Sequence, residues 1–177
     1  MNDIVRLARA YHFAALKHVH QRRKGELAEP YMNHLIEVAE LVAGATDGAD
    51  LDLVIAAVLH DVVEDQGVAL AELAAVFGQR VADFVDEVTD DKTLPKAERK
   101  RLQVVHAASA TVGAKTIKLA DKTSNLRALA SSPPTGWDAT RRTEYVAWAG
   151  KVIDQCRGVN AELERLFDDA AEAAERA

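Results

Sequence analysis

The sequence predicts an all-α fold, with one domain built as a bundle of helices. Apolar residues recur at the helical spacing i, i+3, i+4, i+7, as in Val81, Phe84, Val85 and Val88. No comparable run alternates apolar and polar residues, as a half-buried strand would. All four prolines fall between periodic segments, and no repeat or low-complexity linker divides the 177 residues. These observations favour a single helical domain.

Three helices are expected in the amino-terminal half of the chain. Ile4 and Leu7 begin an apolar stripe that predicts the first helix. Residues 32–44 predict the second, and His34 lies on its inward face because apolar residues follow four, seven and eight positions later. Residues 51–63 are apolar nearly all round, so we expect one continuous helix buried at the centre of the bundle.

Two further helices are expected beyond residue 110. Residues 114–130 place Asp121 on the same face as apolar residues, so its carboxylate points to the interior. A long apolar stripe then runs from Tyr145 to Cys156, and Asp138 is suited to be the N-cap of that helix. The first of these helices therefore brings a second ionisable group, besides His34, toward the core.

Charge is distributed unevenly along the chain. Six acids and two arginines follow residue 157, whereas residues 1–157 are close to neutral. Leu163, Phe167 and Ala170 keep helical spacing within this acidic part. Residues 1–157 are thus the expected body of the domain, and residues 158–177 are expected to form an acidic C-terminal helix that packs on it.

Composition excludes several classes of protein. The net charge of −6 disfavours a general nucleic-acid binder. No stretch approaches the roughly 20 apolar residues of a membrane helix, and the first residues lack the apolar core of a signal peptide. The single cysteine, Cys156, excludes an internal disulfide framework and a cysteine-rich zinc module. We therefore expect a cytoplasmic protein that does not bind a membrane, whose oligomeric state the sequence does not determine.

The most apolar segment contains a polar pair, His60 and Asp61. Burying such a pair is costly unless it has partners or a metal. His34 and Asp121 also face inward, and together the four residues offer two imidazoles and two carboxylates. Such a mixed set suits Mn²⁺, Fe²⁺, Co²⁺ or Zn²⁺ and leaves coordination positions open on an ion that prefers six. The sequence thus predicts a buried, catalytic type of metal site.

A competing interpretation is that these side chains form only a polar core network, since a lone histidine on an apolar face is usually just hydrogen-bonded. Glu64 and Asp65 follow within one helical turn and add negative charge beside the core. No lysine or arginine is evident on the same faces, because Lys118 and Lys122 lie at other helical angles than Asp121. This density of negative charge favours a bound cation.

Several motifs, in one order, resemble a known family. They include PYMNH at 30–34, AAVLHDVVED at 56–65 and GAKTIKLADKTSNLR at 113–127. The chain resembles the HD-domain hydrolases of the RelA/SpoT type over roughly residues 5–157. The greatest similarity is to the small stand-alone alarmone hydrolases, the group that includes the metazoan SpoT homologue. The resemblance implies an HD-domain helical bundle and a place in the stringent response.

The resemblance also implies an activity. Such enzymes hydrolyse (p)ppGpp at the 3′-diphosphate to GDP or GTP and pyrophosphate, normally with Mn²⁺. His34, His60, Asp61 and Asp121 would hold the ion, while Glu64 and Asp65 would orient a water molecule and take its proton.

Seven substrate contacts follow from the resemblance alone. On the nucleoside side, Arg23 would stack on guanine and Lys24 would contact its edge. Tyr31 and Asn125 would hold the ribose. On the phosphate side the implied contacts are Lys96, Arg141 and Tyr145. Tyr145 has a competing interpretation as a core tyrosine, and Asn125 can equally brace its helix.

Three other functions remain open at this point. An HD-type nucleotidase or phosphatase would use the same metal site on another nucleotide, such as NADPH. A nucleotide-sensing module would keep the cavity without turnover, although Glu64 and Asp65 argue against it. A purely structural helical domain would need buried cations to compensate the acids.

Overall fold

The computed structural model describes residues 2–177, and it confirms the all-α prediction. Within these residues the chain forms ten α-helices and no β-strand, with two isolated β-bridges in the loops. The helices are α1 (Asp3–Lys17), α2 (Met32–Ala45), α3 (Leu51–Leu59), α4 (Val62–Gln66), α5 (Leu70–Phe77), α6 (Gln79–Val88), α7 (Lys96–Ser109), α8 (Val112–Ser131), α9 (Ala139–Asp154) and α10 (Ala161–Arg176). None of the helices that the structure describes is long and apolar enough to cross a membrane.

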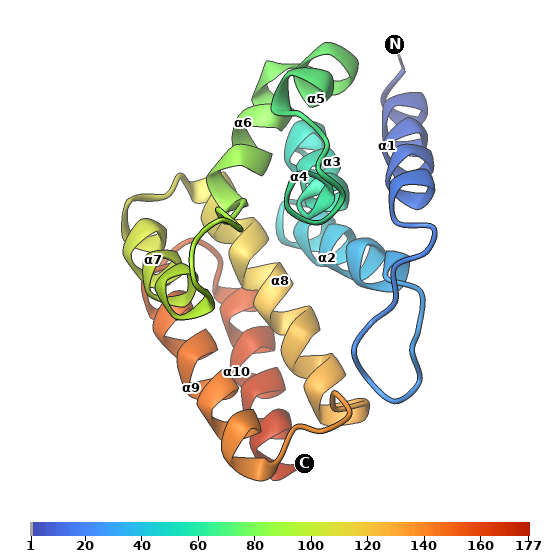
Figure 1. The fold of residues 1–177 in the computed structure, drawn as a ribbon. Helices are drawn as coiled ribbons and strands as arrows, with labels where there is room; N and C mark the ends of the chain where they lie inside the picture. The colour runs from blue at the N-terminus through green and yellow to red at the C-terminus, as the bar shows by residue number, and fades with distance from the viewer. Residues whose placement is uncertain (1) are drawn as a thin grey trace.

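Helix α8 runs through the middle of the molecule, with α2 and α3 on one side and α9 and α10 on the other (Figure 1). Helix α3 is buried along its length, from Leu53 to Leu59, which agrees with its nearly uniform apolar sequence. Helices α1, α2 and α6 pack around it. The core therefore forms one continuous cluster that extends from α1 to α10.

The continuous helix expected over residues 51–63 is interrupted, so this part of the prediction is wrong. Helix α3 ends at Leu59 and α4 begins at Val62. The His60 ring donates through Nδ1 to the carbonyl oxygen of Ala57 at 2.8 Å. In an uninterrupted helix that oxygen would accept from the backbone of Asp61. The interruption leaves His60 and Asp61 between two helices rather than on the surface of one.

Helix α10 packs against α8 and α9. The Asn160 side chain caps it by accepting from the backbone of Leu163 at 2.8 Å, and it also donates to the carbonyl oxygen of Ala45 at 2.9 Å. Leu163 and Phe167 are buried against the rest of the protein. The acidic side chains of α10 other than Glu164 face solvent, where Arg165 pairs with its neighbours along the helix.

Gly113 is a point of close contact between α8 and the layer formed by α3 and α6. A Cβ atom at this position would lie 2.3 Å from the Phe84 ring and 3.1 Å from the Leu53 side chain. Overpacking of this kind typically costs about 1–3 kcal/mol, whereas alanine gains about 1 kcal/mol over glycine in helix propensity. Gly113→Ala is therefore expected to lower the free energy of unfolding, measured by denaturant titration. Gly150→Ala, where nothing lies within 4 Å, is the control and should be neutral or stabilising.

Candidate active site

Four sequence-predicted residues meet where α2, α8 and the α3–α4 junction converge. Single ligand atoms of His34, His60 and Asp121 all lie within 4.8 Å of one another. The Asp61 carboxylate lies beside them, with Oδ2 3.2 Å from His60 Nε2 and 3.7 Å from His34 Nε2. The two imidazoles are buried, while the two carboxylates keep 17–18% of their side-chain surface exposed. This cluster is the right size for one cation and is open on its carboxylate side.

Hydrogen bonds determine the tautomers of both histidines. His34 Nδ1 lies 2.8 Å from the Ser124 hydroxyl. That hydroxyl donates to Glu37 at 2.7 Å, so it accepts from the ring. His60 donates through Nδ1 to Ala57. Both Nε2 atoms are buried and have no hydrogen-bond partner within residues 2–177. Because Nδ1 carries the proton in each ring, Nε2 presents a lone pair that no hydrogen bond uses. Metal-bound histidines have this arrangement, so these residues fit a divalent ion.

Charges in the cluster shift its pKa values in opposite directions. Burial lowers the pKa of His34, and Asp121 only partly opposes this. Burial also acts to lower the pKa of His60, but the charge of Asp61 outweighs it and raises this pKa to about 9. The pKa values of Asp61 and Asp121 are lowered in spite of burial, by His60 and by Lys122 respectively. Both carboxylates are therefore ionised at neutral pH, and a cation competes with a proton for His60.

The expectation that no buried base compensates Asp121 is wrong. Lys122 Nζ lies 2.8 Å from Asp121 Oδ2, and the same ammonium lies 4.9 Å from the centre of the Trp148 ring. The long side chain of Lys122 reaches around the helix to its neighbour, which helical angles alone do not reveal. Asn125 donates to the other oxygen of Asp121 at 2.6 Å. Asp121 is thus held at both oxygens. Of the two interpretations of Asn125, a ribose contact or a brace within its helix, this hydrogen bond corresponds to the brace.

Glu64 and Asp65, the predicted water-activating pair, lie on α4 next to the cluster. Glu64 accepts from the backbone of Asp90 at 3.2 Å, and burial followed by the charge of Asp61 raises its pKa. Asp65 accepts from the Gln21 amide at 2.7 Å through one oxygen and from Lys92 through the other. The two acids are therefore in different environments although they are adjacent in sequence.

A cavity of about 670 Å³ opens beside these acids. Five of the seven predicted substrate contacts line it, namely Arg23, Lys24, Tyr31, Asn125 and Tyr145. The Tyr31 hydroxyl donates to Asp61 at 2.5 Å, so this tyrosine connects the cavity to the metal cluster. Arg23 donates to Asn125 at 3.3 Å. The Tyr145 ring lies tilted against the Trp137 ring, and its hydroxyl makes no hydrogen bond to any residue in 2–177. A second cavity, of about 140 Å³, lies against His60 and Lys118.

Lys96 and Arg141 do not line either cavity. Lys96 is the exposed first residue of α7. The Arg141 guanidinium lies 4.5 Å from the centre of the Trp137 ring, and Trp137 lines the larger cavity. Burial lowers the pKa of Lys100, and the charges of Lys96 and Arg141 add to this effect. The structure therefore does not bring these two predicted contacts to the lining of either cavity.

Sequence reasoning missed several residues of the site. Gln21 holds Asp65, and Ser124 holds His34. Ser124 shares the inward face of its helix with Asp121, which is a signal for its role. Gln21 comes from a segment far from α4 in sequence, so no local spacing indicates its partner.

In this helical bundle, buried imidazoles and carboxylates lie beside two acids and a cavity lined by basic side chains. This arrangement is typical of a metal-dependent hydrolase that acts on a phosphorylated substrate. The sequence profile of the HD-domain family matches residues 10–149. The chain therefore belongs to the HD-domain family.

Curated relatives and a solved structure support this assignment. A Drosophila melanogaster protein named guanosine-3′,5′-bis(diphosphate) 3′-pyrophosphohydrolase MESH1 is 48% identical over 89% of this chain and 88% of its own length. The Homo sapiens protein of the same name is 47% identical over 94% and 93%. A solved structure described as a metazoan ortholog of SpoT that hydrolyses ppGpp matches with a TM-score of 0.90 at 45% identity, over 94% of both chains. These matches confirm the predicted family, the SpoT-type HD-domain hydrolases.

Proposed function

We propose that the protein hydrolyses (p)ppGpp at the 3′-diphosphate and releases pyrophosphate together with GDP or GTP. One observation carries the proposal: the 670 Å³ cavity, lined by arginine, lysine and tyrosine side chains, reaches the His-Asp cluster and the Glu64–Asp65 pair. Relatives that are 47–48% identical over nearly the whole chain bear the name of this activity.

The proposed ion is Mn²⁺, held by His34, His60, Asp61 and Asp121. A mixed imidazole and carboxylate set suits this ion, although Fe²⁺, Co²⁺ and Zn²⁺ can use the same ligands. When bound, the ion supplies a Lewis acid for a phosphate oxygen and lowers the pKa of a water molecule. The buried Nε2 atoms without partners support the assignment of the two histidines.

The chain's own residues supply the rest of the chemistry. In the proposed mechanism, Asp65 stays a hydrogen-bond acceptor and orients the attacking water, while Glu64 takes its proton. The raised pKa of Glu64 suits a group that must accept and then release a proton. Lys92 and Arg99 lie 3.7–3.8 Å from Glu64 and add positive charge where the diphosphate oxygens gather.

The nucleoside is proposed to occupy the larger cavity. Arg23 is the proposed stacking partner of guanine, Lys24 contacts its edge, and Tyr31 with Asn125 holds the ribose. All four residues line the cavity, and Tyr31 donates to Asp61, which supports a ribose next to the metal. Tyr145, Lys96 and Arg141 are proposed to contact the phosphates, the last two from outside the cavity.

The proposed partner is a nucleotide alone. The net charge of −6 disfavours nucleic acid as a substrate. We place the reaction in the cytoplasm, which is compatible with the single cysteine being unpaired and buried.

A product assay tests this function. The Mn²⁺-loaded protein is incubated with ppGpp and, separately, with NADPH, and the products are separated by ion-exchange chromatography. We expect GDP and pyrophosphate from ppGpp, complete loss of turnover on chelation, and recovery when Mn²⁺ is restored, because the ion supplies the Lewis acid. Orthophosphate from NADPH with no product from ppGpp would instead assign the site to a phosphatase. Metal binding without turnover of either nucleotide would indicate a sensing module.

A further inference from the structure

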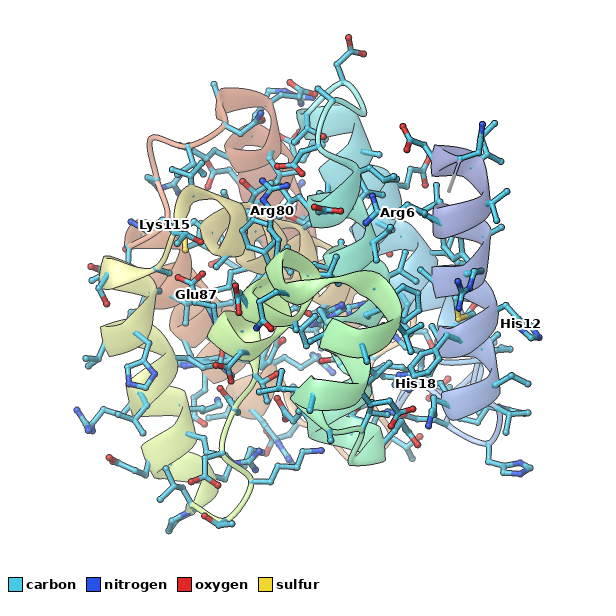
Figure 2. The ribbon with its side chains drawn as sticks, turned by 90° about the horizontal axis from the view of Figure 1, so that it is seen from above. Arg6, His12, His18, Arg80, Glu87 and Lys115 are labelled. Carbon is cyan, nitrogen blue, oxygen red and sulfur yellow. The ribbon has the colours of Figure 1, made fainter. Side chains whose placement is uncertain are left out.

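His18 is a buried histidine that lies outside the predicted site. It follows the last residue of α1 and is 2% exposed. Figure 2 shows that His12, on the same helix, projects away from the molecule, whereas His18 lies on the side of α1 that faces the other helices. The ring packs on Tyr31, with centroids 5.3 Å apart and planes at 18°. Its Nδ1 lies 2.7 Å from Oε1 of Gln21.

The Gln21 side chain connects this histidine to Asp65. Its Nε2 donates to Asp65 Oδ2 at 2.7 Å. Its Oε1 receives two donors, Nδ1 of His18 and Nε2 of Gln66. An amide oxygen can only accept and an amide nitrogen can only donate. The two donors therefore fix the orientation of the amide, and the nitrogen must face Asp65.

A fixed donor at Asp65 has a chemical consequence. With Gln21 on Oδ2 and Lys92 on Oδ1, both oxygens of Asp65 accept hydrogen bonds, and the carboxylate is held in one orientation. Tyr31, the stacking partner of His18, donates to Asp61. His18 therefore supports a carboxylate of the water-activating pair through Gln21 and contacts the residue that holds Asp61.

We infer that His18 and Gln21 are positioning residues for hydrolysis: the Nδ1 donor of His18 fixes the Gln21 amide, and that amide holds the Asp65 carboxylate aimed at the attacking water. Neither residue touches the reacting atoms in this arrangement. The inference rests on the proposed function for its kinetic consequence, whereas the position of the proton on the His18 ring can be measured without turnover.

Isosteric variants test the hydrogen bonds separately from packing. Gln21→Glu keeps the shape but places a carboxylate oxygen against Asp65, and His18→Leu removes the Nδ1 donor. We expect kcat for ppGpp to fall about 10–100-fold in both, the usual range for loss of such a supporting partner, with KM and bound Mn²⁺ unchanged. His18→Asn should recover much of the activity because its amide nitrogen can replace Nδ1. His12→Leu, at the exposed position on α1, is the control and should match the wild type.

A double-mutant cycle shows whether Gln21 acts through Asp65. Gln21→Leu should lower kcat in the wild-type background and have no further effect in the Asp65→Asn background. Equal effects of Gln21→Leu in both backgrounds, or a change in KM alone, would overturn the inference. Unchanged kcat in Gln21→Glu would overturn it as well, provided that the melting temperature shows a folded protein.

Side-chain nitrogen NMR gives the readout that is independent of activity. The Zn²⁺-loaded protein is used, and the His18 signals are assigned by their absence from His18→Asn. We expect Nδ1 of His18 to carry a proton, and loss of that preference in Gln21→Leu. A ring whose Nδ1 carries no proton would contradict the inference even in an active enzyme. Absence of ppGpp hydrolysis in the wild type would refute the proposed function, while the tautomer would still decide the positioning role.

Discussion

Replacing His60 with alanine is expected to release the ion and abolish hydrolysis of ppGpp. His60 Nε2 is buried, without a hydrogen-bond partner in the part of the chain described, and points into the cluster of carboxylates. Loss of a ligand should weaken binding by more than the roughly 10–100-fold that loss of a ligand's hydrogen-bond partner costs. Elemental analysis after dialysis measures the bound metal, and His106→Ala, at an exposed position on α7, is the control.

Asp121→Ala should also release the ion, and it should destabilise the fold more than His60→Ala does. The reason is that it leaves Lys122 buried without its partner, a change that typically costs about 3–5 kcal/mol. Unfolding in denaturant separates the two effects, because metal content is normalised to folded protein. Full metal occupancy in both variants would show that the ion is held elsewhere.

The second large effect is expected from removing the acids next to the metal. Glu64→Gln combined with Asp65→Asn should lower kcat by about 10²–10⁴-fold, the usual contribution of general acid–base catalysis. Both changes preserve the size of the side chains and leave the four proposed ligands in place. Bound Mn²⁺ should therefore stay at the wild-type level, which distinguishes this variant from His60→Ala.

The matched control for the acid pair is Glu175→Gln, which removes one negative charge from the exposed face of α10. It should leave kcat and KM unchanged. The single variants separate the contributions of the two acids to kcat. Asp65→Asn should disturb the donors Gln21 and Lys92, whereas Glu64→Gln should remove only the proton acceptor. Wild-type turnover in the double variant would exclude both acids from the mechanism.

The sequence predicts the helices well where one side of a helix is buried. The stripes of α6 and α10 are regular because each packs one face on the core. The interruption at His60 and Asp61 was not predictable, because the His60 ring replaces a backbone donor at Ala57, and apolar periodicity does not register such a choice. The inward directions of His34 and Asp121 followed from spacing alone, and the fold brings both to the cluster.

The remaining parts of the site depend on contacts between distant segments. Gln21 meets Asp65 across 44 positions of sequence, and Ser124 meets His34 across 90. Lys122, in contrast, is adjacent to Asp121 in sequence. Helical angles predict that the two side chains diverge, but the long, flexible lysine side chain still reaches the Asp121 carboxylate. Residue type and spacing thus identify the groups that face the core, while their supporting partners are decided by the tertiary fold.

The interruption between α3 and α4 supplies two of the proposed metal ligands, so it links the stability of the fold to the concentration of the metal ion. The four proposed ligands come from α2, from the junction after α3 and from α8, so an unfolded chain presents them far apart. An ion that binds only the folded chain adds RT ln(1 + [L]/Kd) to its stability, about 2.7 kcal/mol when the ion is at 100 times its Kd. Free divalent metal at the proposed ligands would therefore raise the stability of the folded chain as well as support turnover.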